Sequence, residues 1–179
     1  MLTYDETGGY PHPDHIRTHE VSVAAFDAAA DPDRYPEAGP PFQPLKLYYH
    51  ATFTRRRLEA IHAAAAARGI ETPFAEWLKR WEEDEGPEPV VTTQVDVARW
   101  LDRRRDALIA HATQIDPNSF WFSVPEKVIA EIYPWEDYTL ARSTVPVGTP
   151  GVNDPVETDL FAGIDGYGSP DAGQRSADR

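Results

Sequence analysis

The sequence predicts an α/β fold in which helices cover a largely parallel sheet. Short segments rich in β-branched and aromatic residues have the composition of strands, and longer segments between them carry apolar residues at helical spacing. Strands that alternate with helices of about 10 to 20 residues are typical of layered α/β folds. At 179 residues the chain is long enough to form one such domain, and no internal repeat is visible.

The first predicted elements are a strand, a tight turn, a helix and a second strand. Residues 2–4 (LTY) end a strand, and the paired glycines of segment 5–9 (DETGG) permit a sharp turn. A helix is predicted over about residues 16–30, since apolar residues recur on one face. The five prolines of residues 31–44 indicate a loop, and residues 45–51 (LKLYYHA) alternate like a strand.

Two helices are predicted in the middle of the chain. Thr54 is a suitable N-cap for a helix that runs to about residue 68, and a shorter helix is predicted over about residues 73–82. Trp77 and Trp81 lie one turn apart on the shorter helix, so we interpret them as core side chains or as the wall of a pocket.

The remaining ordered chain is predicted as one more strand, one long helix and several shorter pieces. Residues 90–95 (VVTTQV) are β-branched enough for a strand, and Asp96 can cap a helix over about residues 97–115. The domain is completed by the aromatic patch 120–122, the segment 125–138 and the last anchored piece 159–163. We expect residues 1–163 to form the domain and residues 164–179 to be a disordered tail.

Composition narrows the functional classes. Thirty acidic residues against 17 basic ones give a formal net charge of −13, which disfavours binding to nucleic acid or to an anionic membrane. No apolar run approaches the ~20 residues of a membrane span, so we expect a cytoplasmic protein. Because there is no cysteine, disulfides, thiolate nucleophiles and thiolate metal sites are excluded. A metal would have to bind histidine or carboxylate side chains.

The densest group of metal-binding and acid-base side chains follows the glycine turn. It contains three of the six histidines and further polar residues: His12, His15, His19, Tyr10, Asp14 and Glu20. Imidazoles held beside a rigid glycine turn can converge on a metal or take part in acid-base catalysis. The alternative is a polar helix start in which Asp14 caps the helix, but this alternative does not explain three histidines together.

Other polar groups are given structural interpretations. His111 lies near the end of the predicted long helix, where the helix dipole favours a protonated imidazole. His50 is interpreted as a packed strand end rather than as part of a pocket at the sheet edge. The arginine runs at 55–57 and 103–105 are interpreted as solvated helix faces rather than as phosphate sites. The sequence contains no nucleophile elbow, P-loop or dinucleotide-binding glycine motif.

Several motifs, taken in order, carry a resemblance to a known family. They are GGYPHPDH at 8–15, LYYHA at 47–51, EWL at 76–78, VTT at 91–93, AHATQ at 110–114 and DLFAG at 159–163. Over about residues 1–163 the chain resembles the mycothiol S-conjugate amidases, which are PIG-L/LmbE-type zinc amide hydrolases of actinobacteria. The related N-acetylglucosaminyl-inositol deacetylases share the HPDH loop, whereas the later motifs favour the amidases. The resemblance implies a Rossmann-like, largely parallel sheet.

The resemblance also implies a chemistry for the histidine loop. Zinc in that family is bound by two histidines and an aspartate, and the ligand from this loop corresponds to His15. His12 would be the general acid for the leaving amine, Asp14 would orient the catalytic histidine, and Tyr10 would stabilise the oxyanion. The implied substrate is a mycothiol S-conjugate, cleaved to an acetylcysteine conjugate and glucosaminyl-inositol.

A second loop of that family, of the type AHPDDE, supplies the other zinc ligands and the general base, and it has no counterpart here. We therefore expect the chain to correspond to the C-terminal half of the enzyme, to bind zinc poorly and to turn over no conjugate alone. His19 and Glu20 could make a weaker substitute site with His15. The alternative is a non-catalytic remnant that binds a thiol conjugate or a partner, such as the missing N-terminal half or a second copy.

Overall fold

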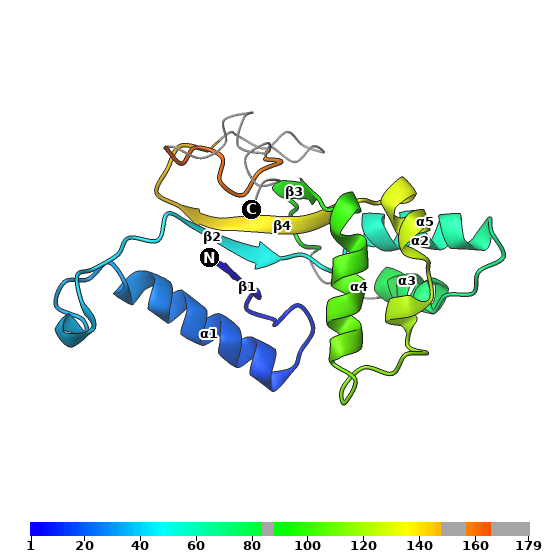
Figure 1. Cartoon of the computed structure of the whole chain (residues 1–179), viewed down its shortest axis with the longest axis horizontal. Coiled ribbons are helices and arrows are strands. Elements are labelled where there is room, and N and C mark those ends of the chain that lie inside the picture. Colours follow the sequence, from blue (N-terminus) through cyan, green and yellow to red (C-terminus); the bar gives the residue numbers. More distant parts are fainter. Residues whose placement is uncertain (84–87, 148–156, 166–179) are drawn as a thin grey trace. The chain divides into compact units, whose positions relative to one another are not determined.

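The computed structural model describes residues 1–83, 88–147 and 157–165, which belong to two compact units (Figure 1). The first unit combines Met1–Thr52, Val90–Val95 and Asp137–Arg179, and the second combines Phe53–Pro89 and Asp96–Glu136. Among the described residues, no helix is both long enough and apolar enough to cross a membrane.

The strands form one mixed sheet in the order β1-β2-β4-β3. They are β1 (Leu2–Thr3), β2 (Lys46–His50), β3 (Thr93–Asp96) and β4 (Trp135–Ser143). β1 pairs with β2 in parallel, with Leu2 opposite Tyr48, and β2 pairs with β4 antiparallel, with Tyr49 opposite Thr139. The predicted α/β class is confirmed. The prediction of a largely parallel sheet is not confirmed, because β2 has an antiparallel neighbour.

The sequence does not predict β4, the longest of the described strands. Glu136, Asp137 and Arg142 interrupt its apolar pattern, and acidic residues are depleted in strands. The structure accommodates Asp137, which is fully buried, by a hydrogen bond of 2.8 Å from Gln94 Nε2 to its Oδ1. A buried carboxylate needs such a partner, and no local pattern in the sequence reveals it.

A long helix, α1 (Pro13–Ala28), lies beside β1 (Figure 1). It begins earlier than the predicted residue 16, because proline is well suited to the first turn of a helix. Phe26 is its buried apolar side chain. The predicted loop 31–44 contains one short 3-10 turn, η1 (Pro36–Ala38).

The second unit is built mainly from helices. They are α2 (Arg55–Ala66), α3 (Phe74–Glu83), η2 (Ala98–Trp100), α4 (Leu101–Ala110), η3 (Phe120–Phe122) and α5 (Glu126–Ile132). Thr54 caps α2 as predicted, since its Oγ1 accepts a 3.3 Å hydrogen bond from the Arg57 N–H. The helix predicted over 97–115 is shorter, because it starts as a 3-10 turn and the backbone leaves the helical region at His111 (φ −82°, ψ 39°).

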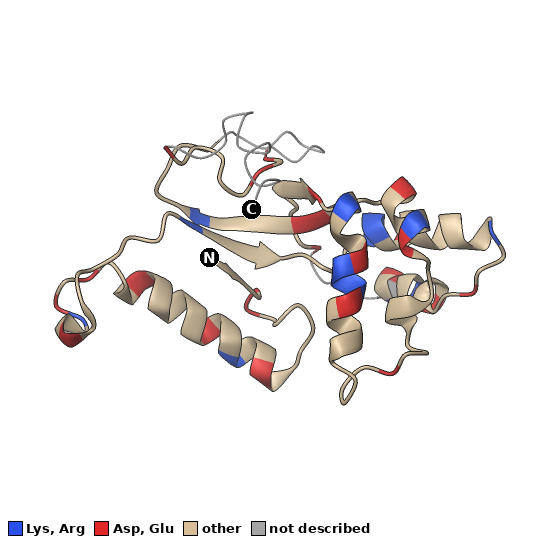
Figure 2. Cartoon of the chain, viewed as in Figure 1, with Lys and Arg blue, Asp and Glu red and all other residues tan. Residues whose placement is uncertain are grey.

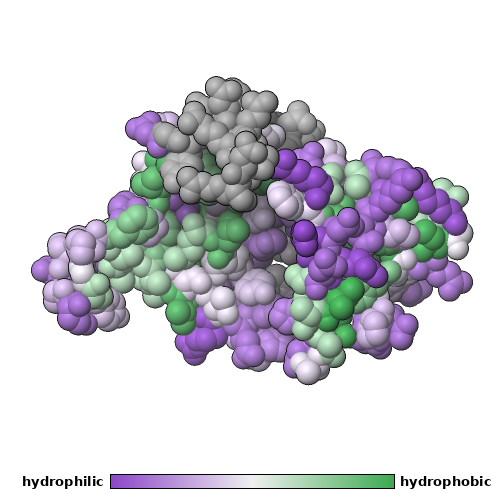
Figure 3. All heavy atoms as spheres, viewed as in Figure 1, coloured by the Kyte–Doolittle hydropathy of each residue, from purple (hydrophilic) through white to green (hydrophobic). Residues whose placement is uncertain are grey.

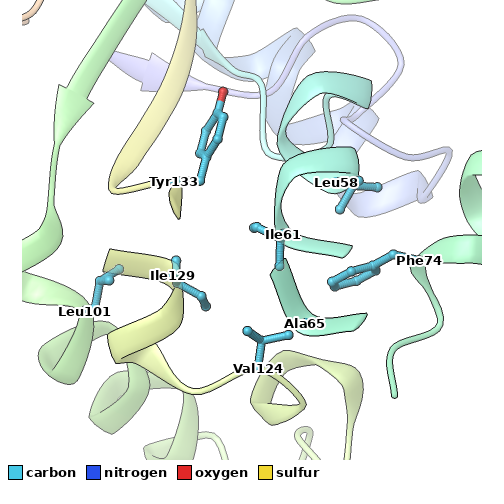
Figure 4. Packing of buried hydrophobic residues seen from close by; sticks show 8 residues of the cluster. All are labelled: Leu58, Ile61, Ala65, Phe74, Leu101, Val124, Ile129 and Tyr133. Carbon is cyan, nitrogen blue, oxygen red and sulfur yellow. The ribbon is translucent and has the colours of Figure 1, made fainter. Parts of the chain in front are cut away.

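The core of the second unit is a cluster of apolar side chains (Figure 4). Its buried members are Leu58, Ile61, Ala65, Phe74, Leu101, Val124, Ile129 and Tyr133. The three members from α2 are spaced so that they share one helix face. Trp77 and Trp81 pack against this cluster, which confirms their interpretation as core side chains.

The arginine runs of the second unit form ion pairs with other elements of that unit. Figure 2 shows basic and acidic residues interspersed on its helices. Arg57 and Arg104 both contact Glu136, at 3.6 and 2.7 Å, and Arg105 lies 3.1 Å from Glu126. Arg57 is buried, so the run at 55–57 is not simply a solvated helix face.

A buried polar network fixes the chain after residue 157 to the sheet. Lys46 Nζ donates to Glu157 Oε1 over 2.5 Å and to the Ala162 carbonyl over 2.7 Å. The Tyr48 hydroxyl donates to Glu157 Oε2 over 2.7 Å. Burial, followed by this hydrogen bond to Glu157, raises the pKa of the Tyr48 phenol. The tail predicted over 164–179 lies outside the described residues from residue 166 onward.

Candidate metal and acid-base site

A turn between β1 and α1 builds the candidate site. Asp5 Oδ1 accepts three hydrogen bonds from this turn: from the Thr7 N–H (2.9 Å), the Thr7 hydroxyl (2.7 Å) and the Gly9 N–H (3.0 Å). The Gly8 N–H donates to the Asp5 backbone carbonyl over 3.0 Å. The Asp5 residue therefore determines the path of the backbone between the end of β1 and the start of α1.

The paired glycines adopt the left-handed conformation that a sharp turn requires. The φ angle is 78° at Gly8 and 71° at Gly9. Gly8 is buried, and a Cβ atom built on it would lie 2.8 Å from the Cβ of His15. Position 8 therefore requires glycine both for its backbone conformation and for its close approach to α1.

His12 is the N-cap of α1. Its Nδ1 accepts a 3.2 Å hydrogen bond from the Asp14 N–H, and its own backbone is extended (φ −103°, ψ 130°). The alternative in which Asp14 caps the helix is wrong, because Asp14 lies inside the first turn. Since the lone pair of Nδ1 is used in the cap, the neutral His12 ring carries its proton on Nε2.

His15 has the opposite tautomer. Its Nδ1 lies 3.0 Å from the carbonyl oxygen of Gly8. A carbonyl oxygen only accepts hydrogen bonds, so Nδ1 carries the proton and Nε2 keeps a lone pair. The half-buried ring stacks on Tyr4, with centroids 4.1 Å apart and planes 7° from parallel. Metal-binding imidazoles are typically supported by a backbone carbonyl or carboxylate in this way.

Three of the four predicted site residues come together at this point. The Tyr10 ring meets the His15 ring edge-on at 4.7 Å, and the His12 ring centroid lies 5.2 Å from that of His15. Tyr10 is 50% exposed, so it lies at the surface of the group. Asp14 contacts His12 through its backbone N–H and not, in the described part of the chain, through its carboxylate.

His19 is held in a similar way one turn further along α1. Its Nδ1 lies 2.9 Å from the Tyr4 carbonyl oxygen, and its ring meets Tyr49 edge-on at 5.3 Å. Glu20 pairs with Arg17 over 2.5 Å. Within residues 1–83, 88–147 and 157–165, no three histidine or carboxylate side chains converge to hold a metal ion. The substitute site of His15, His19 and Glu20 is therefore not formed by the described residues.

The sequence reasoning does not identify the residues that support His15. Tyr4 supplies the stacking ring, Asp5 fixes the turn, and Gly8 supplies the carbonyl. The two glycines indicate a turn after the strand, but they do not reveal which carbonyl group and which ring will meet His15.

Two of the other histidines have side-chain partners, and the third lies at a helix end. His50 Nδ1 lies 3.2 Å from Thr52 Oγ1, and the His50 ring meets Tyr138 at 4.8 Å, in agreement with a packed strand end. His62 Nδ1 lies 2.9 Å from Thr72 Oγ1. His111 is the C-cap residue of α4, which agrees with its predicted place near a helix end.

Curated proteins that match this chain include an amidase and several deacetylases. The mycothiol S-conjugate amidase of Streptomyces coelicolor is 52% identical over 166 residues, which are 92% of this chain and 55% of the relative. The chain spans about half the length of the curated relatives it matches.

Two of the deacetylases come from Frankia alni and Thermobispora bispora, and both are named for 1D-myo-inositol 2-acetamido-2-deoxy-alpha-D-glucopyranoside. Each is 38% identical over 92% of this chain and 56% of the relative. No family model matches the chain. The predicted resemblance to mycothiol S-conjugate amidases, with the deacetylases as related enzymes, is thus confirmed.

Proposed function

We propose that this chain supplies part of a zinc-dependent amidase site that hydrolyses the amide bond of mycothiol S-conjugates. The products would be an acetylcysteine conjugate and glucosaminyl-inositol. The 52% identity with the Streptomyces coelicolor amidase supports the substrate class. The structural observation that carries the proposal is the His15 ring, which the Gly8 carbonyl and Tyr4 fix with a lone pair available on Nε2.

In this proposal His15 binds the metal through Nε2. Zinc would polarise the amide carbonyl and lower the pKa of a bound water. The hydrogen bond from Nδ1 to the Gly8 carbonyl orients the ring and leaves Nε2 as the nitrogen that can bind a metal. A neutral imidazole supported in this way fits the ligand that the resemblance assigns to this loop.

His12 would deliver the proton that leaves with the amine. An amine departs from a tetrahedral intermediate when its nitrogen is protonated, and a neighbouring imidazole is the usual donor. The proton on His12 Nε2 is the available one while Nδ1 caps the helix. Tyr10, whose ring lies edge-on to that of His15, would donate a hydrogen bond from its hydroxyl to the oxyanion. Asp14 would position the His12 ring through the hydrogen bond from its backbone N–H.

We further propose that the chain alone binds zinc weakly and turns over no conjugate. Catalytic zinc sites use three protein ligands and keep one position open. His15 is the ligand that the resemblance assigns to this chain, and one imidazole cannot replace three ligands.

Zinc titration of the chain, followed through the ring signals of the six histidines by NMR, tests the assignment of His15. We expect His15 to respond first and weakly, and we expect that response to be absent in His15→Ala. His111→Ala, which removes the exposed C-cap imidazole of α4, is the matched control and should leave the response intact. A stoichiometric, tightly bound zinc together with amidase turnover would contradict the proposed weak binding.

Activity can be tested by combining the chain with the part of the Streptomyces coelicolor amidase that it does not span. The mixture should cleave a mycothiol S-conjugate faster than the deacetylase substrate named for the other relatives, and His15→Ala should abolish cleavage. Cleavage that persists in His15→Ala would refute the assigned role. Preference for the acetylated inositol glycoside would instead favour a deacetylase.

A non-catalytic, partner-binding role is the second candidate. Figure 3 shows apolar surface on the first unit, and its exposed apolar side chains include Leu2, Val21 and Phe42 at 47, 59 and 69% exposure. Exposed apolar patches often mark interaction surfaces. Light scattering should then show self-association that weakens in Phe42→Ser. A monomer with a cooperative melt and no binding of an apolar dye would exclude this role.

A further inference from the structure

We propose that Asp5 is a positioning residue for His15, and that it acts through the backbone of the glycine turn. By holding segment 5–9, the Asp5 carboxylate places the Gly8 carbonyl where it accepts the proton of His15 Nδ1, and so fixes the nitrogen that is left with a lone pair. The inference deepens the proposed function, because it rests on His15 being the ligand of that site.

The first step is the contact between Asp5 and the turn. One oxygen, Oδ1, accepts from two backbone N–H groups and one hydroxyl, at 2.9, 3.0 and 2.7 Å. These donors lie on either side of Gly8, at Thr7 and Gly9. Hydrogen bonds to an ionised carboxylate are roughly twice as strong as neutral ones, so the turn loses its main restraint when this oxygen is removed.

The second step is the fit of Gly8 against His15. Gly8 is buried at φ +78°, and its carbonyl lies 3.0 Å from His15 Nδ1. The 2.8 Å separation between a built Cβ and the His15 Cβ shows that backbone and helix are in direct contact at this point. A small shift of the turn therefore changes the hydrogen bond to the ring.

The third step is that His19 provides an internal reference. Its Nδ1 bonds to the Tyr4 carbonyl, at the end of β1, over 2.9 Å. This carbonyl precedes the turn that Asp5 holds. If α1 and β1 stay folded, a change in the turn should alter the tautomer of His15 and leave that of His19 unchanged.

The experiment is a long-range ¹H–¹⁵N NMR measurement of the ring tautomers at about pH 8.5, where an ordinary imidazole with a pKa near 6.5 is neutral. The native chain should show His15 and His19 with the proton on Nδ1 and His12 with the proton on Nε2. In Asp5→Ala we expect His15 alone to change to a mixture of both tautomers. Asp5→Asn, which keeps an oxygen acceptor, should restore much of the native population.

Two controls separate positioning from general loosening. Asp116→Ala removes a loop carboxylate that accepts the Asn118 N–H over 2.8 Å in the second unit, and it should not affect His15. Gly8→Ala should disturb His15, whereas Gly69→Ala, at φ +68° with no atom within 4 Å of its built Cβ, should not. A native His15 tautomer in Asp5→Ala would overturn the proposal.

If Asp5→Ala does not fold, as loss of the His19 signal would show, Thr7→Val decides the question. This variant removes one of the three bonds to Oδ1 and must still raise the share of His15 with its proton on Nε2. An unchanged share would overturn the proposal.

In the complemented amidase, Asp5→Ala should weaken zinc affinity by about 10- to 100-fold, the usual effect of removing outer-shell support. The tautomer measurement needs no zinc. If His15 is not a zinc ligand, the zinc titration fails while the tautomer change in Asp5→Ala remains, and if Asp5 does not position His15, the tautomer does not change.

Discussion

His12 and His15 use their Nδ1 atoms in opposite ways at the start of α1. His12 Nδ1 accepts from the Asp14 N–H, whereas His15 Nδ1 donates to the Gly8 carbonyl. Each contact with the backbone determines the state of the other ring nitrogen. The two rings, 5.2 Å apart, therefore offer one proton donor and one lone pair, which are two of the several functions that the proposed metal-assisted amide hydrolysis needs.

The capping role of His12 can be separated from its proposed role in proton transfer. His12→Ala should lower the free energy of unfolding by about 0.5–2 kcal/mol, the usual cost of losing an N-cap. His12→Asn should recover most of that loss, because its side-chain oxygen can accept the Asp14 N–H, but it cannot protonate an amine at its nitrogen. Urea unfolding measures the free energy of unfolding of each variant. His111→Ala is the control, because it removes a histidine from the C-terminal end of another helix, α4. Equal destabilisation by the two His12 variants would show that the cap contributes little.

Much of the candidate site could be predicted at the scale of single residues. The density of ligand-type side chains selects Tyr10, His12 and His15 together, and the structure brings their rings close to one another. Their catalytic and metal-binding roles come from the resemblance and stay predictions. Tyr4 and Asp5 could not be found in this way, because their contributions depend on how the backbone folds back after β1. Tyr4 stacks on the ring of His15, eleven positions later in the chain. Asp5 does not touch His15 but holds the turn that does.

At the scale of elements, local signals place several helices and strands, but segment 125–138, which has no predicted type, contains α5 and the start of β4. Periodic apolar residues and the Thr54 cap place α2, and the same spacing supplies three members of the second unit's core. β4 was missed because its charged positions are satisfied by residues distant in sequence, such as Gln94 for Asp137. Helix ends also depend on individual residues, since α4 stops at Ala110 although apolar spacing continues to residue 115.

The core of the second unit predicts a large difference between two positions of α4. Leu101 is 2% exposed and belongs to the apolar cluster, while Ile109 on the same helix is 46% exposed. Leu101→Ala should lower the free energy of unfolding by about 2–5 kcal/mol, because it leaves a cavity as well as losing buried area. Ile109→Ala should change it by roughly 0.5 kcal/mol or less. Similar effects in denaturant unfolding would show that the cluster in Figure 4 does not stabilise this unit.

At the scale of the whole molecule, the first unit is formed by stretches that are far apart in the chain. One sheet contains strands from all three of these stretches, which are Met1–Thr52, Val90–Val95 and the part that begins at Asp137. The ion pair between Lys46 and Glu157 connects the first stretch with the last. Thr93 Oγ1 also donates to Glu157 Oε2 over 3.1 Å. Because breaking a buried charge pair leaves the remaining charge without compensation, this network ties the stability of the three stretches together.

The network makes the first unit sensitive to alkaline pH through Tyr48. Burial and the hydrogen bond to Glu157 raise the pKa of this phenol above the value of about 10 for an exposed tyrosine. The folded protein therefore keeps the Tyr48 proton at pH values where the unfolded chain has lost it. The stabilisation is complete below about pH 10 and declines as the pH rises towards the folded-state pKa.

Tyr48→Phe tests this pH dependence, because phenylalanine keeps the ring and removes the titrating group. The free energy of unfolding, measured between about pH 9 and 11, should fall more steeply with pH for the native chain than for Tyr48→Phe. Tyr48→Phe should also be less stable at neutral pH, since Glu157 loses the hydroxyl that donates over 2.7 Å. Tyr10→Phe, at an exposed position, should keep the steep native dependence. If Tyr48→Phe kept that dependence as well, the Tyr48 phenol would titrate alike in both states, and its contact with Glu157 would not explain any loss of stability in alkaline solution.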